Sequence, residues 1–233
     1  KGYLLNGMFG QNVFCYPQNS ICLAVNGGLD DFFQTCDLYK AADSVFASDK
    51  TDEKSDKKDI KRLYDFCKEA KNTQDIKFQT SLFFDLKSKH FLRKKSYTFT
   101  SDNSNSVSVM PLVLQVIQNN YTKGLKRFFF TKEDGDLAIN FIEGSQKHTL
   151  PIGFGYPKRT ELEFNGEFYN VATLGAFAKD EEDRLVLKLR ISFTETASTR
   201  FMRFRFYENG GVSVKVFEAP GMEFIFTNGE SFL

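Results

Sequence analysis

The sequence LLNGMFGQNVFCYPQNSICLAVN (residues 4–26) predicts a β-hairpin, and this hairpin decides the fold of the N-terminal part of the chain. Residues 13–16 are rich in strand-favouring side chains, and residues 21–25 form a second apolar run. Between them, Pro17-Gln18-Asn19-Ser20 is a turn, because proline presets φ and the Asn and Ser side chains bond locally to the backbone. The glycines of residues 6–11 indicate a tight backbone that another group approaches closely.

A helix is expected after the hairpin. Gly27-Gly28 ends the second strand, and Asp30 precedes an amphipathic run. Its apolar positions have helical spacing, at Phe32, Phe33, Cys36, Leu38 and Tyr39.

Three motifs of this region are followed by the expected helix: Gly-Met-Phe-Gly-Gln-Asn (residues 7–12), Tyr-Pro (16–17) and Val-Asn-Gly-Gly (25–28). The arrangement resembles the C-terminal part of a serine β-lactamase-like hydrolase domain, as in bacterial penicillin-binding proteins, class C-type β-lactamases and related esterases. In that family a Lys-Thr-Gly motif or a variant lies on a strand at the edge of the catalytic cleft, followed by two antiparallel strands and a helix. The resemblance covers residues 1–46. It implies a cleft edge whose backbone helps to bind an oxyanion or a carboxylate, formed by Asn6, Gly7, Met8 and Gly10.

No catalytic residue is expected in this chain. In the family, the Ser-x-x-Lys nucleophile motif and a Tyr-x-Asn or Ser-x-Asn motif precede the third motif. This sequence starts only a few residues before the expected third motif, and its first residue is Lys rather than Met. Ser55-Asp56-Lys57-Lys58 has the first spacing but lies in a charged run. Tyr207-Glu208-Asn209 and Ser101-Asp102-Asn103 are typical of a turn and a polar loop. The resemblance therefore implies a truncated, non-catalytic C-terminal piece of an acyl-serine hydrolase, whose main partner is the missing N-terminal catalytic domain.

The predicted domains are residues 1–48, a charged linker at 49–58, and a second domain at 59–233. The linker, DKTDEKSDKK, is almost wholly charged and has almost no apolar surface to bury. The second domain begins with a helix near Asp59, because apolar residues from Ile60 to Ala70 recur at helical spacing. This helix is expected to pack on the start of the second domain, with an interaction helix as the alternative.

The rest of the second domain is β-rich from about residue 76. Turn signals, including Asn165-Gly166 of the type I′ kind, separate closely spaced strands. A short helix is expected within residues 110–121. The fold class is therefore α+β, mostly β: an antiparallel meander that closes into a barrel or curves strongly, with one or two packed helices. The predicted strands are residues 95–100, 125–131, 137–142, 147–152, 160–164, 167–178, 185–194, 200–207 and 212–217.

Residues 114–121, 150–154 and 220–224 resemble the C-terminal extension of some bacterial β-lactamase-like hydrolases, and this resemblance implies a placement rather than an activity. The second domain is then an accessory module that shapes the cleft or mediates formation of a homo-oligomer. The alternatives are a barrel that binds a small apolar ligand among its Phe side chains, and an interaction module.

A net charge of +1 argues against nucleic acid or an anionic membrane as a partner, and no apolar run reaches the roughly 20 residues of a membrane span. The pairs Lys188/Arg190 and Arg203/Arg205 alternate along two strands, and would form a basic strip if these strands are neighbours. The strip is expected to be solvated and paired with Asp and Glu, although its mixture of basic and aromatic residues is also typical of single-strand nucleic-acid platforms.

No cofactor or metal site is predicted. The cysteines at positions 15, 22, 36 and 67 lack the spacing of a zinc site, and His90 and His148 have no identifiable partners. The cysteines are expected to be buried thiols, which favours the bacterial cytoplasm, although truncation would also remove any signal peptide. Whether Cys15 and Cys22 pair across the hairpin stays open.

Overall fold

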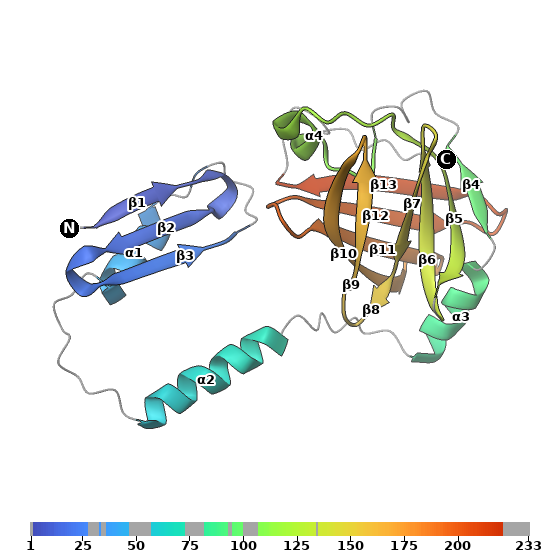
Figure 1. The fold of residues 1–233 in the computed structure, drawn as a ribbon. Helices are drawn as coiled ribbons and strands as arrows, with labels where there is room; N and C mark the ends of the chain where they lie inside the picture. Colours follow the sequence, from blue (N-terminus) through green and yellow to red (C-terminus); the bar gives the residue numbers. More distant parts are fainter. Residues whose placement is uncertain are drawn as a thin grey trace. The chain divides into compact units, whose positions relative to one another are not determined.

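The chain forms two compact units, residues 1–75 and 76–233, in a computed structural model (Figure 1). The structure describes residues 2–27, 33, 36–46, 57–72, 82–92, 95–99, 107–133 and 135–220. Each unit has a hydrophobic core of its own.

The first unit contains a three-stranded antiparallel sheet in the order β1 (Tyr3–Asn6), β2 (Asn12–Tyr16) and β3 (Ile21–Val25). The predicted hairpin is confirmed as β2 and β3. Its turn contains a 3-10 segment at Pro17–Asn19, followed by Ser20 at φ 53°. The segment before the hairpin, which was expected only to be tight, contains the additional strand β1 and its connection to β2.

Helix α1 (Cys36–Phe46) covers one face of this sheet. Its Tyr39 ring lies 5.8 Å from that of Phe14, and its Phe46 ring lies 5.8 Å from that of Tyr16. The Tyr16 hydroxyl donates a hydrogen bond of 2.8 Å to Asp43. The predicted helix is confirmed, but it begins at Cys36, so that Phe33 precedes it and Phe32 lies outside the described residues.

Helix α2 (Lys57–Asn72) confirms the helix expected near Asp59 and begins slightly earlier. It falls in the first unit, on the N-terminal side of the division at residue 75. Its apolar side chains from Ile60 to Phe66 are 56–71% exposed. Residues 49–56 of the predicted linker lie outside the described residues, and Lys57 and Lys58 belong to the helix.

The second unit has two mostly antiparallel sheets. The four-stranded sheet has the order β4 (Ser96–Thr98), β5 (Leu125–Glu133), β6 (Asp136–Glu143) and β7 (Gln146–Pro151). The six-stranded sheet has the order β13-β12-β11-β10-β8, with β9 paired to β10. Its strands are β8 (Gly153–Phe154), β9 (Lys158–Phe164), β10 (Glu167–Lys179), β11 (Leu185–Phe193), β12 (Thr199–Phe206) and β13 (Val212–Ala219).

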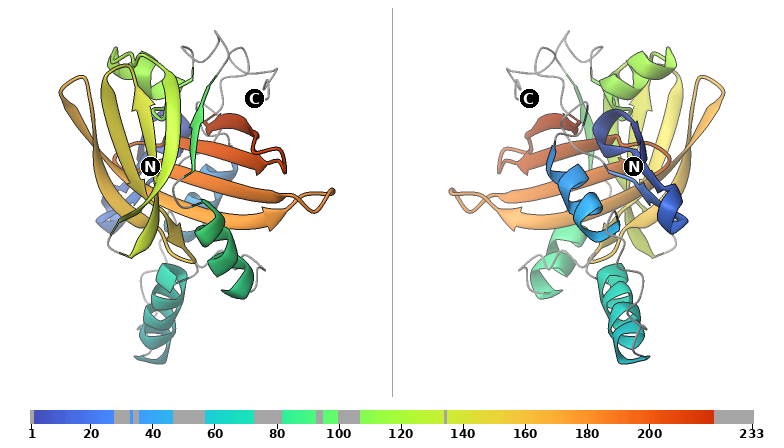
Figure 2. Two further views of the ribbon diagram at one scale, coloured as in Figure 1. Left: turned by 90° about the vertical axis from the view of Figure 1, so that its right-hand side faces the viewer. Right: turned by 90° about the vertical axis from the view of Figure 1, so that its left-hand side faces the viewer.

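The two sheets share one core. In Figure 1, β11–β13 run across the direction of β5–β7, and Figure 2 shows the two sets of strands as separate layers. Phe128 of the four-stranded sheet lies 5.0 Å from Phe204 of the six-stranded sheet, measured between ring centroids. The predicted meander is thus confirmed, but no closed barrel is found, because β7 and β9 lie next to each other without pairing among the described residues.

Two of the described helices belong to the second unit. Helix α4 (Leu112–Gln118) confirms the helix expected within residues 110–121, and Pro111 precedes its first turn. Helix α3 (Leu82–Leu92) was not predicted, because its apolar residues are too scattered to mark one face. Within the described part of the chain, no helix combines the length and the apolar character needed to cross a membrane.

Candidate functional site

The residues of the predicted cleft edge lie together in the connection from β1 to β2. Asn6 ends β1, and Met8–Gly10 form a 3-10 turn in which Phe9 has φ 59° and Gly10 has φ 86°. The Gly7 N–H donates to the Gln11 carbonyl at 2.7 Å. A Cβ at Gly7 would lie 2.6 Å from that same carbonyl oxygen, so the turn requires glycine there.

This turn is a backbone element and contains no acid or base. The Gln11 amide donates to the Gly27 carbonyl at 2.6 Å, which ties the turn to the end of β3. Asn6 and Met8 are exposed, whereas Gly10 is buried. Because no side chain in residues 6–11 is ionisable, the turn can bind or position a group but cannot transfer a proton.

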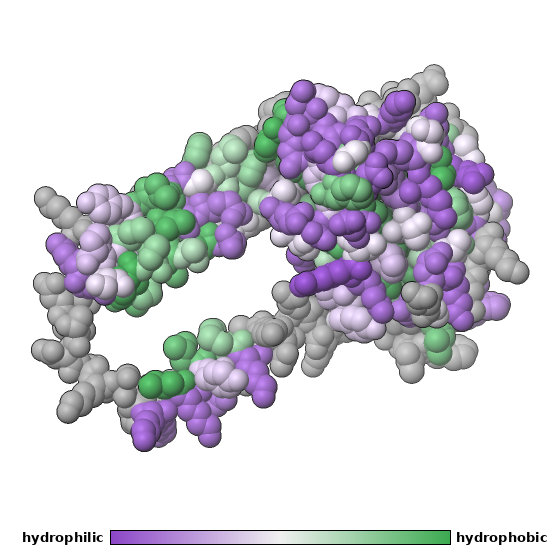
Figure 3. All heavy atoms as spheres, viewed as in Figure 1, coloured by the Kyte–Doolittle hydropathy of each residue, from purple (hydrophilic) through white to green (hydrophobic). Residues whose placement is uncertain are grey.

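One face of the three-stranded sheet carries α1, and the opposite face is apolar and open. Its side chains form two cross-strand rows, Tyr3–Cys15–Cys22 and Leu5–Val13–Ala24. Tyr3 is 73% exposed and Leu5 is 67% exposed. Figure 3 shows hydrophobic residues gathered over this sheet.

The thiols of Cys15 and Cys22 lie on this open face. Their sulfur atoms are 3.5 Å apart and not bonded. The hydrogen bond with Cys22 is the main cause that raises the pKa of Cys15, and desolvation raises it further. The expectation of buried thiols is wrong for Cys22 and Cys67, which are exposed, because each lies on a face that nothing described covers. No group of three or more His, Cys, Asp or Glu in the described ranges can hold a metal ion.

Of the sequence matches to the other hydrolase motifs, the structure describes Tyr207-Glu208-Asn209. Asn209 lies in the turn after β12, where its side-chain oxygen accepts the Gly211 N–H at 2.9 Å. Ser55 and Ser101 lie outside the described residues.

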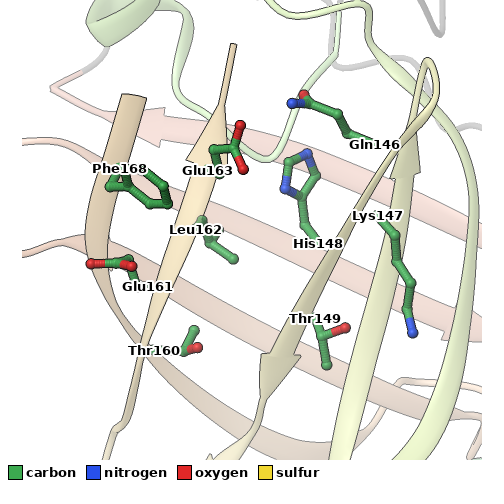
Figure 4. A pocket seen from close by; sticks show the side chains of 9 residues that line it. All are labelled: Gln146, Lys147, His148, Thr149, Thr160, Glu161, Leu162, Glu163 and Phe168. Carbon is green, nitrogen blue, oxygen red and sulfur yellow. The ribbon is translucent and has the colours of Figure 1, made fainter. Parts of the chain in front are cut away.

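A cleft of about 460 Å³ lies between β7 and β9 (Figure 4). In Figure 4, Gln146 and Glu163 turn toward His148, whereas Lys147 points away. The cleft is lined by Gln146, Lys147, His148, Thr149, Thr160, Glu161, Leu162, Glu163 and Phe168.

His148 is the buried group of this cleft. It is 3% exposed, and its ring stacks on Phe164 at 4.3 Å between centroids. Its Nε2 has no hydrogen-bond partner among the described residues. Burial lowers the pKa of His148 to about 4, so the imidazole is neutral at pH 7. The other histidine, His90, is exposed on α3.

The predicted basic strip exists on the outer face of β11–β13. Lys188, Arg203 and Lys215 are directly opposite one another on the three neighbouring strands. The expected neutralisation holds for Arg205, whose Nε lies 2.9 Å from Asp180. The expected neutralisation fails for Lys188, Arg203 and Lys215, which make no ion pair within the described part of the chain. Like charges placed directly opposite each other on paired strands are unfavourable.

The sequence did not predict a buried ionic cluster that fixes the first turn of α4 and the segment before it. Glu218 of β13 accepts hydrogen bonds from the N–H groups of Leu112 at 2.8 Å and Val113 at 3.2 Å. Arg200 of β12 donates to the Met110 carbonyl at 2.9 Å.

A second carboxylate, Glu143 of β6, holds the same segment. It accepts the Val109 N–H at 2.6 Å and the Ser108 hydroxyl at 2.9 Å. Burial raises the pKa of Glu143, although these hydrogen bonds and the nearby Arg200 act against the rise. The cluster is therefore a support for the fold, with every described member engaged by backbone or an opposite charge.

No family model, no curated protein and no solved structure matches this chain.

Proposed function

We propose that this chain is an accessory region of an acyl-serine hydrolase of the β-lactamase-like class, whose nucleophile lies on another part of the full protein. The observation that carries the proposal is the element order β1-β2-β3-α1, with the Asn6–Gly10 turn at the end of the first strand. The sequence resemblance implies a similar order, in which the strand that carries the third active-site motif is followed by two antiparallel strands and a helix.

The open sheet face supports this proposal. A three-stranded sheet with one helix buries little apolar surface, and among the described residues its core has few buried side chains, such as Phe14 and Tyr16. Covering the exposed Tyr3 and Leu5 would remove further apolar area from water, at about 25 cal/mol per Å². In the proposed protein, the rest of the hydrolase domain packs on this face.

In this arrangement the Asn6–Gly10 turn forms part of the cleft wall. Its backbone positions the substrate or the developing oxyanion, and the acid–base and nucleophilic steps belong to residues of the catalytic domain. The second unit is an accessory module that shapes the cleft or mediates homodimer formation.

The alternative function is binding of a small apolar ligand in a barrel-like interior. It requires space among the core Phe side chains. The rings of Phe128, Phe130 and Phe204 lie 5.0–6.4 Å apart between centroids, which is the spacing of rings in contact. We therefore place this alternative second.

Covalent labelling tests the proposal. A fluorescent penicillin and a fluorophosphonate are incubated with this chain and with the full product of its gene. The proposal expects labelling of the full product and none of this chain. Labelling of this chain by itself, or of neither protein, would overturn it.

A variant of the full product tests the role of the turn. Gly7→Ala forces the added Cβ against the Gln11 carbonyl and should slow labelling at least about tenfold, because small displacements of cleft groups are costly. Ser44→Ala, on the exposed side of α1, is the matched control and should label at the normal rate. Equal rates for the two variants would contradict a cleft role for the turn.

A further inference from the structure

The cleft between β7 and β9 is built like a binding site. It lies where the two sheets meet without pairing, so both strands present an unpaired edge there among the described residues. Its volume of about 460 Å³ falls within the ordinary range of small-molecule sites, roughly 300–1,000 Å³.

Several polar groups of the cleft are unused by the fold. The side chains of Gln146, Glu161 and Glu163 make no hydrogen bond and no ion pair with the other described residues. Thr149, in contrast, donates to Asn140 at 2.8 Å. The Gln146 amide both donates and accepts, and the Glu163 carboxylate accepts; in Figure 4 both turn toward His148, whereas Glu161 extends to the Phe168 side of β9. Such a set matches the hydroxyl groups of a sugar, each of which can donate and accept.

His148 is the second, independent observation. His148 lines the cleft, and only 3% of the residue is exposed. Its Nε2 lacks a hydrogen-bond partner in the part of the chain that the structure describes. A buried polar atom without a partner is costly, and a ligand hydroxyl that reaches it would remove this cost.

An aromatic ring completes the site. Phe168 of β10 lines the cleft and is 62% exposed, which is high for so apolar a side chain. Its flat face suits the C–H face of a pyranose ring. The carboxylates of Glu161 and Glu163 would repel an acidic sugar, and Lys147 points away from the cleft in Figure 4.

We propose that the cleft between β7 and β9 binds a neutral saccharide. Phe168 stacks on one sugar ring, Gln146 and Glu163 bind its hydroxyl groups, and His148 reaches the deepest hydroxyl. The proposal concerns the second unit alone and does not depend on the proposed hydrolase function.

Affinity electrophoresis of the whole chain tests the site. Native gels contain one of four neutral polymers (laminarin, hydroxyethylcellulose, galactomannan or soluble starch) or the anionic polygalacturonate. The proposal expects retardation by at least one neutral polymer and none by polygalacturonate. Retardation by polygalacturonate alone, or by no polymer, would overturn it.

Variants then locate the site. Phe168→Ala and Glu163→Gln change exposed residues and should each weaken the binding at least tenfold without changing the circular dichroism spectrum. Phe217→Ala is the matched control, because Phe217 is 49% exposed on β13, outside the cleft lining. Unchanged binding in the first two variants, or an equal loss in the third, would show that the cleft is not the site.

Discussion

Arg200 and Glu218 form an ion pair inside the protein, with Nη1 of the arginine 2.7 Å from a carboxylate oxygen and both side chains at most 3% exposed. The contact at Nη1 is not aligned as a hydrogen bond, and Nε has no partner among the described residues. The pair therefore depends on its charges remaining matched, because a buried charge that loses its counter-charge is strongly unfavourable.

The first prediction concerns the loss of one partner. Arg200→Met should lower the free energy of unfolding of the second unit by about 3–5 kcal/mol, since Glu218 is then left buried without its counter-charge. Urea unfolding followed by far-ultraviolet circular dichroism measures the change.

Arg190→Met is the matched control. Arg190 lies on the neighbouring strand β11 but is exposed, so the same replacement should cost no more than about 0.5 kcal/mol. A loss of similar size in both variants would show that the buried ion pair has no special weight.

The second prediction uses the basic row Lys188–Arg203–Lys215. Lys215→Glu places a carboxylate directly opposite Arg203 and should raise the free energy of unfolding by about 0.2–1 kcal/mol. The gain should shrink in 1 M salt, where the Debye length is only about 3 Å. Lys215→Gln removes the repulsion without adding an attraction, so its free energy of unfolding should lie between those of the natural chain and Lys215→Glu. A gain that does not respond to salt would contradict the electrostatic cause.

Local patterns predicted the individual elements well because each has a local cause. The turn at Asn165-Gly166 was read from the tendency of both residues to adopt positive φ, and they have φ 52° and 87°. Helix α4 was read from its apolar spacing after Pro111. Strand β1 was missed because Tyr3–Asn6 is too short to show a period and is exposed along its whole length.

The functional residues were harder to predict because they depend on distant strands. Arg200 was predicted only as the first residue of a strand, and no role was assigned to it. It shares the alternation of Met202, Phe204 and Phe206, which face the core. That parity was the one signal of a buried arginine. The cleft lining joins β7, β9 and β10, and no local pattern shows that β7 and β9 meet without pairing.

The third prediction concerns Cys15 and Cys22. With sulfur atoms 3.5 Å apart on paired strands, they should form a disulfide when treated with oxidised glutathione, which mass spectrometry detects as the loss of two hydrogen atoms. The bond closes a short loop and should stabilise the first unit by about 2 kcal/mol. Cys22→Ser should show neither effect, and an unchanged midpoint in the oxidised chain would contradict the expected stabilisation.

The same thiols report on the open sheet face. In the proposed full-length protein the hydrolase domain covers this face, so alkylation of Cys15 and Cys22 should be slower than in this chain. Cys67, exposed on α2, is the internal control. Equal protection of all three cysteines would not support coverage of this particular face.

The fourth prediction concerns acid. The pKa of His148 is lowered to about 4 by burial, whereas an unfolded histidine titrates near 6.5. As the pH falls below 6.5, the unfolded chain therefore takes up this proton first, and the folded state loses stability until the pH reaches about 4. The loss from this group amounts to at most about 3 kcal/mol.

His148→Leu should remove this part of the acid dependence. The free energy of unfolding, measured in urea at half-unit steps from pH 7 to pH 4, should fall less steeply in the variant than in the natural chain. Glu143 acts in the opposite sense, because its raised pKa stabilises the fold as the pH falls, and it is present in both proteins. The difference between the two curves therefore isolates His148. Parallel curves would mean that the buried imidazole gains its proton as easily in the folded state as in the unfolded one.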